Sequence, residues 1–148
     1  MERSKERGVL HELVAPLING LGYQIVELTG AQRKSTLHVH LVIHKPTGIN
    51  LEDCTAVYKT IHPRLEVATD ADDVHLEVGS PGVSRTIKDA SEFDIFLDSK
   101  VKVMSDEDSE WVFGVINRVS DDAVVLGIED DERAFYFKRI KKAQLVYP

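Results

Sequence analysis

The chain has 148 residues and a net charge of −7, with 43% hydrophobic and 29% charged residues. This composition is typical of a folded globular protein and excludes a chain that is disordered throughout. The acidic balance argues against a protein whose main affinity comes from neutralising phosphates, because such proteins gather Lys and Arg into a dominant patch. The charge favours a basic partner, although solubility alone would also account for it.

The cellular compartment is indicated by three features. The single cysteine, Cys54, lies in an apolar helical pattern and requires no oxidising compartment. No apolar run reaches the roughly 18 residues of a membrane span. Residues 1–7 mix both signs of charge and lack a following signal-peptide core. We therefore expect a soluble, cytoplasmic protein without membrane contact.

The first half of the chain predicts a helix, two strands, a second helix and a third strand. Apolar residues at three- and four-residue spacing over 9–21 predict a helix that Gly22 ends and that Pro16 kinks or restarts. Strands are expected over 23–29 and 36–43.

A basic loop, 30–34, is expected to join these strands. The second helix begins after the N-cap Asn50, and Pro63 limits its length. A short strand over 74–78 follows, so that two helices cover one face of a small sheet.

The segment Gly79-Ser80-Pro81-Gly82 is the clearest boundary, and it divides the chain into domains 1–82 and 83–148. Pro81 and Gly82 suit a type II turn, in which Gly82 supplies the positive φ. The second domain is expected to contain a short helix followed by strands that form a small barrel, an α+β fold overall. The helix is expected over 90–96 and the strands over 101–104, 111–119, 123–128, 133–137 and 143–147.

The sequence predicts neither a metal site nor a nucleophilic active site. His38, His40 and His44 share one side of a strand and could hold a metal, but no carboxylate or cysteine lies at a matching spacing, so no metal is expected. No nucleophile–base pattern and no phosphate-binding glycine loop occurs in the sequence. We therefore expect neither enzymatic activity nor a cofactor.

Charged segments are the remaining candidates. The acidic segment 105–110 either docks a basic protein or is a solvated hairpin connection. Trp111 and Phe113 are expected to face the barrel interior. The basic pairs 138–139 and 141–142 could touch RNA phosphates after docking but are too small to supply strong affinity alone.

Several separated segments resemble the ribosome maturation factor RimP family in order and spacing. The most specific is the run His75-Leu76-Glu77-Val78-Gly79-Ser80-Pro81-Gly82-Val83-Ser84-Arg85, which is similar to the signature at that family's domain junction. Further similar segments are 15–17, 21–23, 35–37, 48–54 and 140–145.

The resemblance implies an N-terminal α/β domain joined to an Sm-like or SH3-like barrel. It also implies an assembly factor of the small ribosomal subunit, which chaperones a basic ribosomal protein of the decoding region, S-twelve. We expect the chain to be a monomer. A direct ribosomal-RNA-binding module is the alternative. The candidate residues are Asp106, Glu107, Asp108, Glu110 and Trp111 for partner binding, Lys138, Arg139, Lys141 and Lys142 for RNA contact, and Glu77, Gly79, Ser80, Pro81, Gly82 and Arg85 for the junction.

Overall fold

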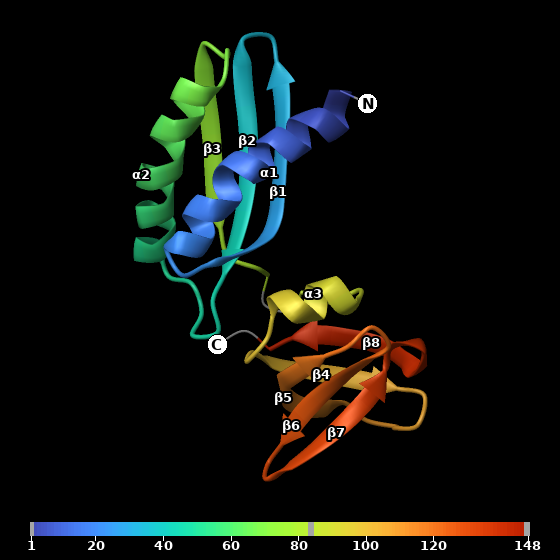
Figure 1. The fold of residues 1–148 in the computed structure, drawn as a ribbon. Helices are drawn as coiled ribbons and strands as arrows, with labels where there is room; N and C mark the ends of the chain where they lie inside the picture. The colour runs from blue at the N-terminus through green and yellow to red at the C-terminus, as the bar shows by residue number, and fades with distance from the viewer. Residues whose placement is uncertain (1, 83–84, 147–148) are drawn as a thin grey trace. The chain divides into compact units, whose positions relative to one another are not determined.

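The computed structural model describes residues 2–82 and 85–146 of the chain (Figure 1). The chain divides into two compact units, which are unit 1 (residues 1–45 and 49–80) and unit 2 (residues 46–48 and 81–148). The order of helices and strands confirms the α+β fold class. The domain boundary expected after Gly82 stays a prediction.

Unit 1 is a three-stranded sheet covered by two helices. Its elements are α1 (Glu2–Gly20), β1 (Gln24–Arg33), β2 (Thr36–His44), α2 (Leu51–Ala68) and β3 (Asp73–Gly79). The central strand β2 pairs antiparallel with β1 and parallel with β3, and α1 crosses the sheet (Figure 1). Apolar side chains from both helices and one face of the sheet form the core, among them Val14, Ile18, Leu41, Ile43, Val57, Ile61 and Leu65.

Both helices of unit 1 run past an internal proline. α1 continues through Pro16, so the expected restart is wrong. α2 continues through Pro63, which lies near its end, and ends at Ala68. A proline removes one helical hydrogen bond, but buried residues on both sides of each proline hold the helices to the sheet. The expected stop after α1 is confirmed, since Gly22 has a φ of 93°.

The connection between β1 and β2 is shorter than the sequence suggested. β1 extends to Arg33, which pairs with Thr36, and this leaves only Lys34 and Ser35 in the turn. Lys34 has a φ of 57°, a value found in tight hairpin turns. The expected five-residue loop is therefore wrong, because Gly30 to Arg33 are part of the strand.

The start of α2 is fixed by hydrogen bonds around Asp53. Asn50 and Asp53 form a capping box, and the Asp53 carboxylate also accepts from the Tyr23 hydroxyl (2.5 Å) and the Lys45 ammonium (3.1 Å). These donors, first the Asn50 backbone N–H and then Tyr23, lower the pKa of Asp53 to about 2. The same hydrogen bond raises the pKa of Tyr23 to about 12.

Unit 2 is a five-stranded antiparallel sheet with one short helix. Its elements are α3 (Ala90–Ile95), β4 (Lys100–Ser105), β5 (Val112–Val119), β6 (Ala123–Ile128), β7 (Asp131–Tyr136), the 3-10 turn η1 (Phe137–Arg139) and β8 (Ile140–Leu145). The strand order is β7-β6-β5-β4-β8. Buried residues include Phe93, Phe96, Val101, Val103, Ile116, Leu126 and Leu145. Closure into an Sm-like or SH3-like barrel stays a prediction.

The turn at the junction begins two residues later than expected, at Gly82 and not at Ser80. The Arg85 N–H donates to the Gly82 carbonyl oxygen over 3.1 Å, so Gly82 is the first residue of the turn. The first residue of a turn needs no positive φ, and Gly82 has none, so the predicted conformation at Gly82 is wrong. Among residues 2–82 and 85–146, no helix has both the length and the apolar character that crossing a membrane requires.

Candidate functional site

The acidic segment 105–110 is held to the sheet of unit 2 by hydrogen bonds and ion pairs. Asp108 accepts from the Ser105 hydroxyl (2.6 Å) and from the Arg133 guanidinium (2.8 Å). These two donors, with Ser105 the larger cause, lower the pKa of Asp108. Asp108 therefore stays ionised, but the guanidinium of Arg133 largely neutralises its charge.

Two other acidic residues of this segment pair with a residue that was expected to contact RNA. Arg139 donates to Glu107 (2.7 Å) and lies 3.9 Å from Asp106. Arg139 and both carboxylates are exposed, so each ion pair can exchange with another charged group. The predicted partner-binding and RNA-contact residues thus meet in one mixed cluster of Asp106, Glu107, Asp108, Arg133 and Arg139.

Unpaired carboxylates lie elsewhere on unit 2. Glu110 follows the mixed cluster. Glu129 and Asp130 form the exposed turn between β6 and β7, and Asp131 is the exposed first residue of β7; we call residues 129–131 the acidic turn. Within residues 2–82 and 85–146, none of these four carboxylates has an ion-pair partner. The run of four acids at 129–132 is the sequence signal of this acidic surface.

Trp111 and Phe113 do not face the interior of unit 2. Phe113 is 50% exposed, whereas Gly114 and Ile116 occupy the inward positions of β5. The predicted orientation is therefore wrong. Close packing explains why Gly114 and not Phe113 faces inward, because a Cβ atom on Gly114 would lie only 2.9 Å from the Gly127 carbonyl oxygen. Trp111 is partly buried, and the Lys102 ammonium lies over its ring, 4.7 Å from the ring centroid.

The other predicted RNA-contact residues lie at the C-terminal end of unit 2. Lys138 and Arg139 belong to η1 and line an open hollow of about 490 Å³ with Asp121, Asp122 and Tyr136. Lys141 and Lys142 are exposed residues of β8. The acidic residues in the hollow lower its affinity for phosphate groups.

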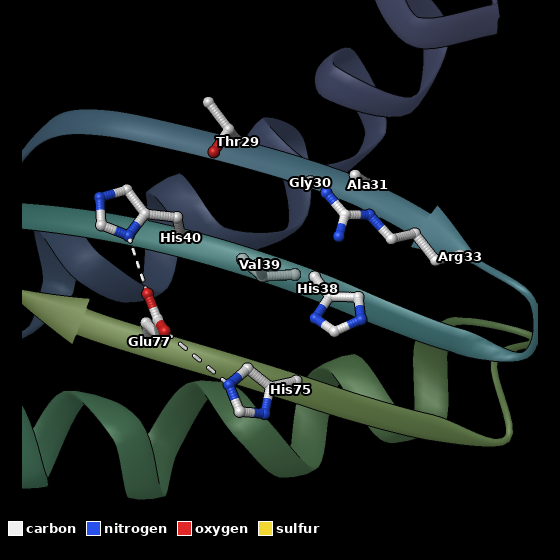
Figure 2. A pocket seen from close by; sticks show the side chains of 9 residues that line it. All are labelled: Thr29, Gly30, Ala31, Arg33, His38, Val39, His40, His75 and Glu77. Atoms are coloured by element: carbon white, nitrogen blue, oxygen red, sulfur yellow. Dashed lines mark ion pairs between the residues drawn. The ribbon is translucent and has the colours of Figure 1, made fainter.

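The open face of the unit 1 sheet carries a group of histidines. The parallel pairing of β2 with β3 places His38 opposite His75 and His40 opposite Glu77. Glu77 lies 3.4 Å from His40 and 3.8 Å from His75 (Figure 2). These residues line a shallow hollow of about 430 Å³. The sequence grouped His38 and His40 with His44, and only the register of β3 reveals that His75 and Glu77 lie beside the first two.

His44, the third histidine of the predicted group, is separated from the other two by burial. It is 1% exposed, and burial lowers its pKa to about 4, so the imidazole is neutral at physiological pH. Among the residues that the structure describes, no cluster of His, Cys, Asp and Glu has the arrangement of a metal site.

The junction residues divide between the two units. Glu77 and Gly79 belong to β3, and the Arg85 guanidinium lies 3.5 Å from Glu92, a residue of α3. Ser80 ends unit 1, and Pro81 and Gly82 begin unit 2. The junction motif thus contributes to local structure on both sides of the boundary.

A comparison with protein families identifies unit 1. Residues 13–84 match the model of the RimP N-terminal domain, which begins within α1 and ends just after the Gly79-Ser80-Pro81-Gly82 segment. The matched range contains the helix–strand–strand–helix–strand order of unit 1 and the junction residues up to Gly82. Residues 13–84 of the chain therefore form an N-terminal domain of the RimP family of ribosome maturation factors.

Proposed function

We propose that the chain is a cytoplasmic, monomeric, non-enzymatic assembly factor of the small ribosomal subunit. In this proposal it binds a basic ribosomal protein of the decoding region and helps that protein to join the ribosomal RNA. The RimP N-terminal domain supports a role in ribosome maturation. The acidic surface of unit 2 supports the binding of a basic partner.

The observation that carries the proposal is the set of exposed, unpaired carboxylates on unit 2. Residues 83–148 contain 14 acidic and 10 basic side chains, giving −4. Four of these carboxylates, Glu110 and the turn 129–131, find no ion-pair partner among the described residues. Complementary charge of this kind steers association and selects a cationic partner.

The mixed cluster adds a way to release the partner. A cationic side chain of the ribosomal protein competes with Arg133 and Arg139 for Glu107 and Asp108. When the partner leaves, the two arginines form their ion pairs again, so neither carboxylate is left without a cationic group. Ribosomal RNA can then take the partner because its charge density is far higher.

Contact with ribosomal RNA is secondary in this proposal. Lys138, Lys141 and Lys142 remain candidates for it, whereas Arg139 is engaged by Glu107. The acidic residues beside Lys138 limit how strongly this end of unit 2 can hold phosphates.

The test compares two variants with the same change in charge. In the first, Glu129→Gln, Asp130→Asn and Asp131→Asn neutralise the acidic turn. In the matched control, Asp94→Asn, Asp98→Asn and Asp121→Asn neutralise three exposed carboxylates elsewhere in unit 2. Affinity for the purified basic ribosomal protein is measured for both by titration calorimetry.

We expect the turn variant to bind at least about tenfold more weakly than the control. Arg133→Gln should bind more tightly than the wild type, because it frees Asp108 for the partner. Equal losses in the turn variant and the control would mean that net charge alone drives binding. If neither variant lost affinity for the ribosomal protein, the acidic surface would have no part in binding it.

A further inference from the structure

The outer surface of three neighbouring strands of unit 2 presents lysines beside aromatic rings. β4 lies between β5 and β8 (Figure 1). Lys102 pairs with Phe113 on one side and with Gln144 on the other, and Lys100 pairs with Val115. We call this outward set the lysine–aromatic face; it comprises Lys100, Lys102, Met104, Trp111, Phe113, Val115, Lys142 and Gln144.

The burial pattern shows that this set points away from the core. The alternate residues Val101 and Val103 of β4 and Ala143 of β8 are at most 1% exposed. Phe113 is 50% exposed and Val115 37% exposed on the opposite side of β5. Two large apolar side chains are thus left in water by strands whose inward positions are fully packed.

Charge is segregated on this face. It contains three lysines and no carboxylate, although acidic residues outnumber basic ones in unit 2. Lys100, Lys102 and Lys142 have no carboxylate partner in the described ranges 2–82 and 85–146. Lys102 instead lies over the Trp111 ring, 4.7 Å from its centroid.

This combination fits single-stranded RNA better than a protein ligand. Exposed rings can stack on unpaired bases of any sequence, and adjacent lysines neutralise the phosphates that link them. Double-stranded RNA hides the faces of its bases, so it cannot use the rings. The basic ribosomal protein of the proposed function would be repelled by the three lysines.

We propose that the lysine–aromatic face binds a single-stranded segment of RNA. Bases stack on Phe113 and Trp111, and the phosphates lie along Lys100, Lys102 and Lys142. This goes beyond the chaperone proposal and does not depend on it, because the face differs in sign and position from the acidic turn 129–131. A factor with both surfaces would hold a cationic protein and an unpaired RNA segment on one small unit.

The test uses the full chain and a single-stranded oligouridine of roughly 12 nucleotides. Trp111 is the only tryptophan, so stacking should quench the intrinsic fluorescence at saturation. We expect Phe113→Ala to weaken binding about tenfold. We expect Lys102→Gln to lower the slope of log affinity against log salt by about 0.7, the value of one phosphate contact on a single strand.

Two matched controls locate the site. Lys88→Gln removes the charge of an exposed lysine outside the face, and Tyr136→Ala removes the exposed ring beside Lys138. Both should bind as the wild type does. Circular dichroism should show that the half-exposed Phe113 can be replaced without unfolding.

The proposal is overturned if Phe113→Ala and Lys102→Gln both leave binding and its salt slope unchanged. It is also overturned if duplex RNA binds as tightly as the oligouridine, or if Tyr136→Ala causes the larger loss. A weaker affinity of Phe113→Ala for the basic ribosomal protein, with RNA binding unaltered, would assign the face to that protein instead.

Discussion

Replacement of Gly114 by alanine tests the close packing that turns Phe113 outward. The added Cβ atom would lie 2.9 Å from the Gly127 carbonyl oxygen, 3.1 Å from the Leu126 Cβ atom and 3.2 Å from the Ile128 Cγ1 atom. The nearest of these belongs to the backbone, so the paired strands β5 and β6 must move apart. Overpacking of this kind costs about 1–3 kcal/mol.

Part of that cost is offset because alanine restricts the unfolded chain more than glycine does, by about 0.4–1 kcal/mol. The midpoints of these two ranges leave a net loss of stability of about 1.3 kcal/mol. For a domain of this size, a change of 1 kcal/mol shifts Tm by about 4–8 °C, so the transition of unit 2 should fall by about 5–10 °C. Trp111 emission follows this transition, because it is the only tryptophan and lies in unit 2.

Gly127→Ala is the matched control, since it adds the same methyl group to the neighbouring strand. Its Cβ atom would meet the Asn117 side-chain amide at 2.7 Å, and that group can rotate away. The main cost is the Asn117–Glu132 hydrogen bond, so we expect a loss below about 1 kcal/mol. An equal or smaller effect at Gly114 would refute the packing argument.

Three further predictions concern ionisable groups of unit 1. One tyrosine should ionise near pH 12 in an ultraviolet titration, and Tyr23→Phe should remove that step and lower the stability of unit 1. Because the pKa of Asp53 is about 2 in the folded state, its contribution to stability is present above about pH 3.8 and is lost as the pH falls through 2. Urea unfolding of wild type and Asp53→Asn should therefore converge at low pH; parallel curves would contradict this. Burial lowers the pKa of His44 from 6.5 to about 4, so the stability difference between wild type and His44→Gln should shrink as the pH falls from about 6.5 to 4.

Local sequence signals predicted most of the fold. Hydrophobic periodicity placed both long helices and the central strand β2, and the cap at Asn50 marked the start of α2. Errors arose where tertiary packing overrides local preference. Pro16 does not interrupt α1, because Val14 and Ile18 are fully buried on either side of it.

The site was predicted less well, for two physical reasons. Trp111, Phe113 and Val115 are more apolar than the residues that alternate with them, so the sequence pattern turned them inward. Gly114 faces inward instead, because the backbone of β6 passes too close to leave room for a side chain there. The Arg133–Asp108 ion pair joins residues 25 positions apart, so no local pattern reveals it. Sequence alone therefore counted these carboxylates as available, although the sheet brings an arginine to them.

The most direct test of the central claim is a salt series for binding of the basic ribosomal protein to the full chain. If exposed carboxylates of unit 2 hold the partner, its affinity should fall steeply from low to physiological ionic strength. Neutralising residues 129–131 should flatten that dependence more than the matched control does. An affinity that stays constant across the series would contradict the account.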